Sequence, residues 1–261
     1  LTIVVFNHLW KIFRSDEQDN ERFSLHFLAP HFVVGLIAGL LPLVHLHSLA
    51  VLFITAAFLL FLRLDKWREW LAFGVGVAII AVPELVWSIT GSATETSKFF
   101  GWHFGWDSGD ANFVWFWLKN TGILFPLIVG GMWLVYTSTK RGSDEGENVS
   151  RPIALLQFYL PFAFLFLLSN IAKLAPWEWD NIKVLIYWYV GSIPFAAIAI
   201  SWMWKRSSGL KAVAAACFLV MILSGSLDVW RTASGQIKNR VFEPDGVAVA
   251  EKIKRTTDPH A

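Results

Sequence analysis

The chain has 261 residues, of which 55% are hydrophobic and 16% charged, with 15 tryptophans and 22 phenylalanines. Soluble domains carry about 25% charged residues, so this composition argues against a surface that faces water and favours a lipid bilayer. The net charge of +2 excludes the strongly basic balance of a nucleic-acid-binding protein, and a single cysteine, Cys217, excludes a disulfide framework or a cysteine metal site.

Apolar runs of the length that crosses a bilayer follow one another through most of the chain. We interpret residues 1–26 as the inner end of a truncated helix followed by a cytoplasmic loop, because LTIVVFNHLWKIF is too short to span. The sequence predicts an all-α, polytopic membrane protein with about seven transmembrane helices in one domain over residues 27–230. The expected spans are 27–45, 48–63, 70–89, 113–136, 153–173, 182–204 and 209–230.

Basic residues alternate between the connecting loops and thereby predict the orientation. Lysines and arginines gather in RLDKWRE, TKRGSDEGENVSRP and KRSSGLK, and such loops face the cytoplasm. The alternation therefore places the N-terminal end inside and three other turns outside, near 45–48, 90–112 and 174–183. The compact loops favour a bacterial inner membrane as the location.

The C-terminal residues 231–261 are polar and differ from the apolar runs before them. Val247, Ala250 and Ile253 are spaced as on one face of a short helix, and Asp245 is placed to cap its start. We expect this tail to begin a soluble extracytoplasmic domain.

The segment LAPWEWDNIK, at 174–183, concentrates polar groups beside tryptophans at the start of an expected span. Glu178, Asp180 and Asn181 could bind sugar hydroxyls or a divalent cation, and Lys183 would attract phosphate. The tryptophan faces could stack on sugar rings. The alternative interpretation is an aromatic belt whose polar residues reach lipid headgroups.

Two histidines, His45 and His47, lie one residue apart in the first outside turn. They could make interfacial hydrogen bonds, contact a substrate or contribute to a metal site. A metal site would need further ligands from other loops, so we predict no metal ligands and leave a divalent cation as one possible cofactor.

Two charged residues fall inside expected spans. Glu84 and Lys119 each lie about six residues from the outer end of a span, roughly 9 Å deep. Intramembrane charges are usually paired or functional. We therefore expect a Glu84–Lys119 ion pair, with phosphate binding by Lys119 and snorkelling to the interface as the alternatives.

Several segments together resemble the C-type superfamily of membrane glycosyltransferases, known as GT-C. The resemblance lies in GLLPLVHLHS (39–48), NFVWFWLKNTGILFPL (112–127), APWEWDNIKVLIYW (175–188) and the tail FEPDGVAVAEKIKRTTDPHA. It implies transfer of a sugar from a polyprenyl-phosphate donor at the outer face of the membrane. The family's usual catalytic acid lies in its first external loop. We expect that loop to lie outside this sequence, so the catalytic residue stays unknown.

On this resemblance, the partners are the lipid bilayer and a lipid-linked sugar donor, with no nucleic acid. The acids and amide at 178–181 would hold the sugar or a cation, and Lys119 or Lys183 would offset the donor's phosphate. His45 and His47 complete the expected binding residues. The competing hypotheses are a transporter or flippase that uses Glu84 and Lys119, and a non-catalytic membrane subunit.

Overall fold

A computed structural model describes residues 2–14, 25–90, 100–144, 150–237 and 243–257, and these residues are mostly helical. The N-terminal part contains α1 (Thr2–Arg14), α2 (Leu25–Gly39), α3 (Leu41–Val44), α4 (Leu46–Leu62), η1 (Leu64–Lys66) and α5 (Trp67–Thr90). The middle contains β1 (Gly101–Trp102), α6 (Phe113–Thr121), α7 (Leu124–Asp144) and α8 (Ser150–Ile171). The C-terminal part contains β2 (Ala172–Lys173), η3 (Glu178–Asn181), α9 (Ile182–Trp204), α10 (Ser208–Ala233) and α11 (Pro244–Thr256).

The helices confirm an all-α, multi-pass membrane protein. Among the described residues, five stretches are long and apolar enough to cross a bilayer: His26–Val44, Leu64–Ser88, Ile153–Ile171, Glu178–Trp204 and Ser208–Ala233. These correspond to five of the seven expected spans. The expected span 48–63 is the 17-residue helix α4, which is apolar but shorter than these five.

The expected span 113–136 is not one straight helix, because the chain bends by 86° between α6 and α7. Gly122 ends α6 with φ of +56°, a left-handed conformation that residues with a side chain rarely adopt. Near this end of α6, the Asn120 and Thr121 side chains donate back to Phe116 O and Trp117 O of the same helix. The bent pair would count as a sixth span if both helices belong to one crossing.

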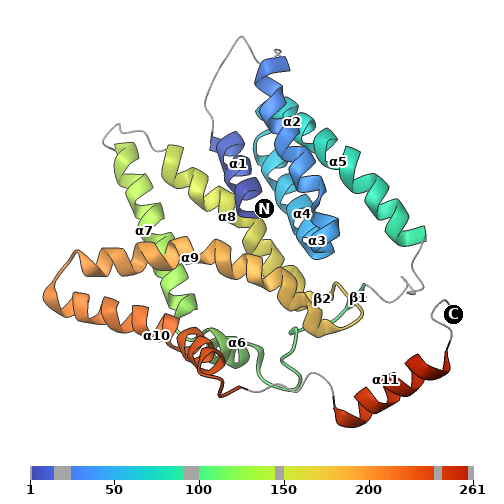
Figure 1. Ribbon diagram of the computed structural model, residues 1–261. Coiled ribbons are helices and arrows are strands. Elements are labelled where there is room, and N and C mark those ends of the chain that lie inside the picture. The colour runs from blue at the N-terminus through green and yellow to red at the C-terminus, as the bar shows by residue number, and fades with distance from the viewer. Residues whose placement is uncertain (1, 15–24, 91–99, 145–149, 238–242, 258–261) are drawn as a thin grey trace.

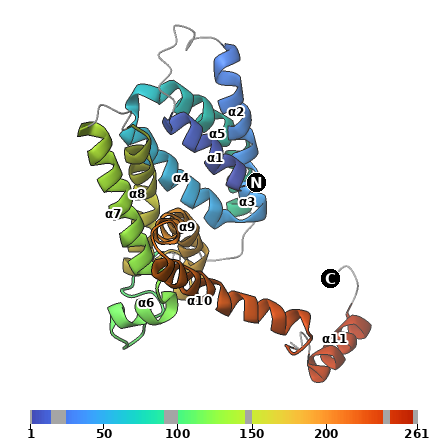
Figure 2. The ribbon, with the colours of Figure 1, turned by 90° about the vertical axis from the view of Figure 1, so that its left-hand side faces the viewer.

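The helices form two packed groups (Figure 1). The first buries apolar side chains of α1, α2, α4 and α5, and the second buries those of α6 to α9. Figure 1 shows α9 running across α7 and α8, and Figure 2, turned by 90°, shows α9 end-on beside the upright α7. This steep crossing carries the first turn of α9 toward the start of α4.

Glycines permit the closest helix contacts. A methyl group at Gly35 of α2 would collide with the backbone oxygen of Phe73 in α5, and one at Gly76 would collide with that of Phe32. Small residues allow helix backbones to approach in this way inside membranes. The α2–α5 pair is therefore held by backbone-to-backbone packing.

Polar side chains also join α8 to its neighbours. The Trp188 indole donates to the Tyr159 hydroxyl at 3.1 Å, and Tyr159 and Ser192 share a hydrogen bond of 2.8 Å. At the other end of α8, the Trp117 indole donates to Asn170 Oδ1 at 2.9 Å. These bonds satisfy buried polar groups and fix how α9 and α6 lie on α8.

Three turns that the sequence places on one side of the membrane meet at one end of the molecule. β1 pairs antiparallel with β2, with Gly101 opposite Lys173, which joins the 100–112 segment to the loop after α8. The start of α9 in turn meets the α3–α4 junction, as described below. The fold therefore places these turns on one side of the molecule, and this holds for either orientation in the membrane.

The helix expected in the tail is present as α11, but its predicted cap is not. Glu243 occupies the N-cap position, Pro244 follows it, and Asp245 falls in the first turn. Proline is favoured at the first helical position because it lacks an amide proton and its φ is already helical. The side chains of α11 are exposed.

Candidate functional site

A cluster of polar side chains lies where the α3–α4 junction meets the start of α9. Lys183 Nζ lies 3.0 Å from Asp180 Oδ1, and Tyr187, one turn after Lys183, is hydrogen-bonded to Ser48 beside the two histidines. The His47 ring lies 5.2 Å from that of His45. The structure therefore brings together four of the seven predicted binding residues from two distant segments.

A hydrogen-bond chain ties these segments together. The Tyr187 hydroxyl donates to Ser48 Oγ at 2.6 Å, and Ser48 Oγ lies 3.0 Å from His45 Nδ1. When the Ser48 hydroxyl donates its hydrogen bond to Nδ1, the neutral imidazole of His45 carries its proton on Nε2. We call His45, His47, Ser48, Asp180, Lys183 and Tyr187 the junction cluster.

The spacing of residues at the start of α9 explains why Lys183 and Tyr187 both belong to this cluster. Lys183 and Tyr187 are four residues apart and therefore share one face of the helix. Asp180, three residues before Lys183, lies in η3 and reaches the same lysine. The pair is partly exposed, with 37% of the Lys183 side chain and 20% of the Asp180 side chain accessible, so a ligand can reach it.

Asn181 lies in the same segment but is fully buried and serves the fold. Its Oδ1 accepts from the Leu174 amide at 3.0 Å, and its Nδ2 donates to the carbonyls of Ser169 and Ala172 at 2.8 and 2.7 Å. Every polar atom of the side chain is thus used by backbone groups. We assign Asn181 to holding the 172–181 loop against α8, which positions Asp180.

Exposed aromatic and acidic side chains directly precede Asp180 of the junction cluster in the sequence. Trp177 and Trp179 are 71% and 56% exposed, and Glu178 between them is exposed as well. Exposed tryptophans at the end of apolar helices are typical of the membrane–water interface. Both interpretations of the sequence, a sugar platform and an aromatic belt, are compatible with this placement.

His47 should make the stability of the protein depend on pH. His47 lies in the first turn of α4, outside the five candidate spans. Burial lowers the pKa of its imidazole most, and the nearby charges of Lys183 and His45 lower it further. The Asp180 carboxylate has the opposite, smaller effect. The folded protein therefore favours the neutral imidazole more than the unfolded chain does. This contribution to stability is fully present above pH 6.5, the ordinary histidine pKa, and is lost as the pH falls toward the lower pKa of the folded state. We expect a lower Tm in detergent as the pH falls from about 7.5 to 5.5.

The matched control for this pH dependence is His47→Gln, which removes the titrating group and keeps a polar side chain. Its Tm should fall less over the same pH interval than that of the unmodified protein. Equal falls in the two proteins would show that His47 does not carry the effect.

Lys119 lies apart from the junction cluster, and the expected ion pair with Glu84 is wrong. Lys119 is exposed at the end of α6 and lines a pocket between the α6–α7 bend, α9 and α10. The structure gives it no ion pair with Glu84, whose Oε2 is buried in α5 without a hydrogen-bond partner among the described residues. The prediction placed Glu84 and Lys119 at similar depth on two straight consecutive spans. The α6–α7 bend gives α6 a different direction, so the two side chains do not meet.

No group of three or more histidine, cysteine, aspartate or glutamate side chains that could hold a metal ion gathers within the described parts of the chain. In the junction cluster, the Lys183 ammonium occupies the position beside Asp180 that a cation would take. The geometry therefore gives no support to the possible divalent cation.

Comparison with protein-family models, with curated proteins and with solved structures finds no match to this chain.

Sequence reasoning missed Ser48 and Tyr187, which complete the junction cluster. The spacing of four residues between Lys183 and Tyr187 was a usable signal, since it places both on one face once the helix is assigned. Ser48 directly follows the predicted His45–His47 pair. Its contact with a residue 139 positions later could not be read from either segment alone.

Proposed function

We propose that this protein is a GT-C-like membrane glycosyltransferase that binds a polyprenyl-phosphate-linked sugar at the junction cluster. The observation that carries the proposal is the hydrogen-bond chain from Tyr187 through Ser48 to His45. It joins the histidine turn to the helix start that bears the Asp180–Lys183 pair and exposed tryptophans. A donor of this kind presents a sugar, a phosphate and an apolar chain at the membrane surface. The cluster offers a cation for the phosphate and hydrogen-bonding groups for the sugar, and the adjoining apolar helices suit the chain.

The residue types suggest how the parts of the donor are bound. The Lys183 ammonium would hold the phosphate and stabilise negative charge on it as it leaves. The Asp180 carboxylate and the imidazoles would bind sugar hydroxyls, and the tryptophan faces would contact the ring. Transfer breaks the bond between the anomeric carbon and the phosphate oxygen and forms one to the acceptor oxygen, whose proton passes to a base that we leave unassigned.

The arrangement in the membrane is part of the proposal. We place the basic loops in the cytoplasm and the junction cluster outside, as the distribution of lysine and arginine favours. The proposed location is a bacterial inner membrane, crossed about seven times if α4 and the bent α6–α7 pair each count once. The tail from 231 onward would then begin an extracytoplasmic soluble region.

The proposal is tested by donor binding and transfer in the purified protein. Loss of a charge-assisted hydrogen bond costs about 1.5–3 kcal/mol, which corresponds to roughly 10- to 100-fold in Kd. We expect Lys183→Ala to weaken binding of a polyprenyl-phosphate sugar by that factor. Asp180→Asn should weaken binding of the sugar-bearing donor but not of polyprenyl phosphate alone.

The matched control is Lys205→Ala, which removes the same charge from the other end of α9. It should leave donor binding unchanged. Unaltered binding in both cluster variants would refute the assignment of the site. Uptake of the lipid-linked substrate by proteoliposomes without any acceptor would instead support the transporter hypothesis.

A further inference from the structure

The pocket lined by Lys119 lies on the opposite side of α9 from the junction cluster. It is bounded by the end of α6, the bend at Gly122 and Ile123, α9 and α10, and its volume is about 950 Å³. Tyr189 of α9 lines it, two residues after Tyr187 of the junction cluster. Two helical residues differ by about 200° around the axis, so the two tyrosines lie on opposite faces of α9.

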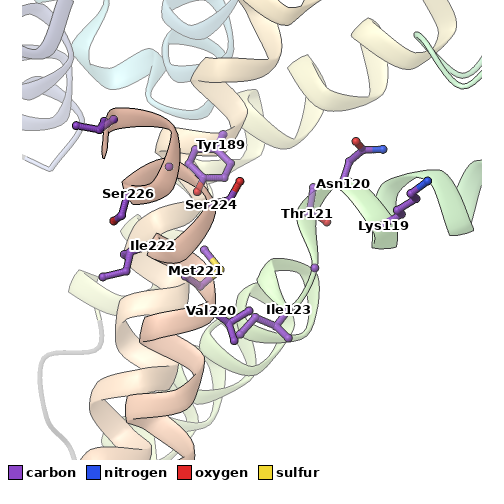
Figure 3. A pocket seen from close by; sticks show the side chains of 13 residues that line it. Lys119, Asn120, Thr121, Ile123, Tyr189, Val220, Met221, Ile222, Ser224 and Ser226 are labelled. Atoms are coloured by element: carbon purple, nitrogen blue, oxygen red, sulfur yellow. The ribbon is translucent and has the colours of Figure 1, made fainter. Parts of the chain in front are cut away.

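The polar residues of the pocket favour an anionic ligand. Figure 3 shows Lys119, Asn120 and Thr121 on the α6 side, with Tyr189, Ser224 and Ser226 on the side of α9 and α10. The lining includes one ammonium group, several hydroxyls and no carboxylate. An anion would therefore meet one full positive charge and hydrogen-bond donors, whereas a cation would meet no compensating charge.

Some of these polar groups are available for a ligand. Asn120 and Thr121 donate to backbone carbonyls of α6, but Lys119, Tyr189 and Ser224 have no side-chain hydrogen bond or ion pair to any described residue. A lysine within or near a bilayer normally finds a partner or reaches the headgroups. A phosphate at the α6 edge of the pocket would supply that partner.

The remaining lining is apolar and points to a ligand with a hydrocarbon part. Val220, Ile222 and Val229 of α10 line the pocket and are exposed. α10 is the least buried of the five candidate spans, with 6% of its apolar window inside the protein, so lipid chains have access to this side. A free anion would leave these surfaces unused, whereas an amphiphile would cover them.

We propose that this pocket binds an anionic phospholipid, with the phosphate at Lys119 and the acyl chains along the apolar residues of α10. Anionic headgroups attract basic residues at the membrane surface. The site is separate from the donor site and does not depend on the proposed glycosyltransferase activity. A bound lipid would hold the α6–α7 bend against α9 and α10.

The test is lipid binding to the full chain measured by native mass spectrometry in detergent, with phosphatidylglycerol and phosphatidylcholine as probes. The unmodified protein should retain phosphatidylglycerol in preference to phosphatidylcholine. Lys119→Gln should weaken phosphatidylglycerol binding by about 10-fold or more, as expected for one charge-assisted bond. Lys119→Arg should restore it, and Lys140→Gln, which removes a cation at the far end of α7, should leave it unchanged.

The other outcomes separate the sources of phosphate. Displacement of the lipid by inorganic phosphate would overturn the proposal in favour of a site for a free anion. If the protein instead retains polyprenyl phosphate in preference to phosphatidylglycerol, and Lys119→Gln abolishes this, the pocket binds the donor lipid and the proposal is overturned. Lys183→Ala should not alter phosphatidylglycerol binding, whatever its effect on donor binding. Weaker phosphatidylglycerol binding in that variant would contradict the separation of the two sites.

Discussion

Replacing Gly131 with alanine should destabilise the protein by about 3 kcal/mol, the upper part of the range for overpacking a well-filled interior. Gly131 lies in α7 against the backbone of α9, and an added methyl group would collide with the carbonyl group and Cα of Phe195. Backbone atoms cannot move aside as the end of a flexible side chain can. The two helices would have to separate, and Phe195 is fully buried at their contact.

The neighbouring Gly130 provides the matched control, because a methyl group there would lie 3.9 Å from the Ala199 side chain, an ordinary contact distance. Gly130→Ala should therefore be neutral or slightly stabilising, since alanine favours a helix over glycine by up to about 1 kcal/mol. Thermal unfolding of both variants in the same detergent measures the difference. Similar Tm values for the two variants would contradict the close α7–α9 approach.

Asn181→Leu should be equally damaging, by about 3 kcal/mol or more, because each buried polar group left without a partner costs about 1–3 kcal/mol. The substitution keeps the shape of the side chain and removes all three of its hydrogen bonds to the backbone. The Leu174 amide and the carbonyls of Ser169 and Ala172 would lose this partner. Because the 172–181 loop carries Asp180, donor binding should fall as well.

Asn120→Leu is the corresponding control, since Asn120 is exposed and its amide makes one hydrogen bond to its own helix. It should change the Tm much less than Asn181→Leu. If Asn181→Leu instead keeps its Tm while losing donor affinity, Asn181 is a ligand-binding residue, as the sequence first suggested, and the structural role assigned above is incorrect.

The helices were predictable where an apolar run coincides with one helix. The runs 153–173, 182–204 and 209–230 match α8, α9 and α10, because hydrophobic length is set by the bilayer and each run ends at a polar loop. The break at Gly122 was not predicted, since a hydropathy average does not register a left-handed glycine. The local sequence Lys-Asn-Thr-Gly did contain a helix-ending signal.

The candidate site was predictable in its residue types but not in its partners. The polar residues of LAPWEWDNIK marked one end of α9, and the alternation of basic loops placed His45 and His47 on the same side. The approach of the two segments depends on how steeply α9 crosses its neighbours, which no local pattern encodes. Asn181 was assigned to binding because exposed and buried amides look alike in a sequence.

The side of the membrane on which the junction cluster lies is the central claim, and cysteine labelling at the two ends of α9 tests it most directly. After replacement of Cys217, single cysteines at Glu178 and Lys205 are treated in intact cells with a membrane-impermeant thiol reagent. The account predicts labelling of the Glu178→Cys protein from outside, and of the Lys205→Cys protein only after permeabilisation. Labelling of both from outside would mean that α9 lies along the membrane, and the reverse pattern would place the cluster in the cytoplasm; either result contradicts the account.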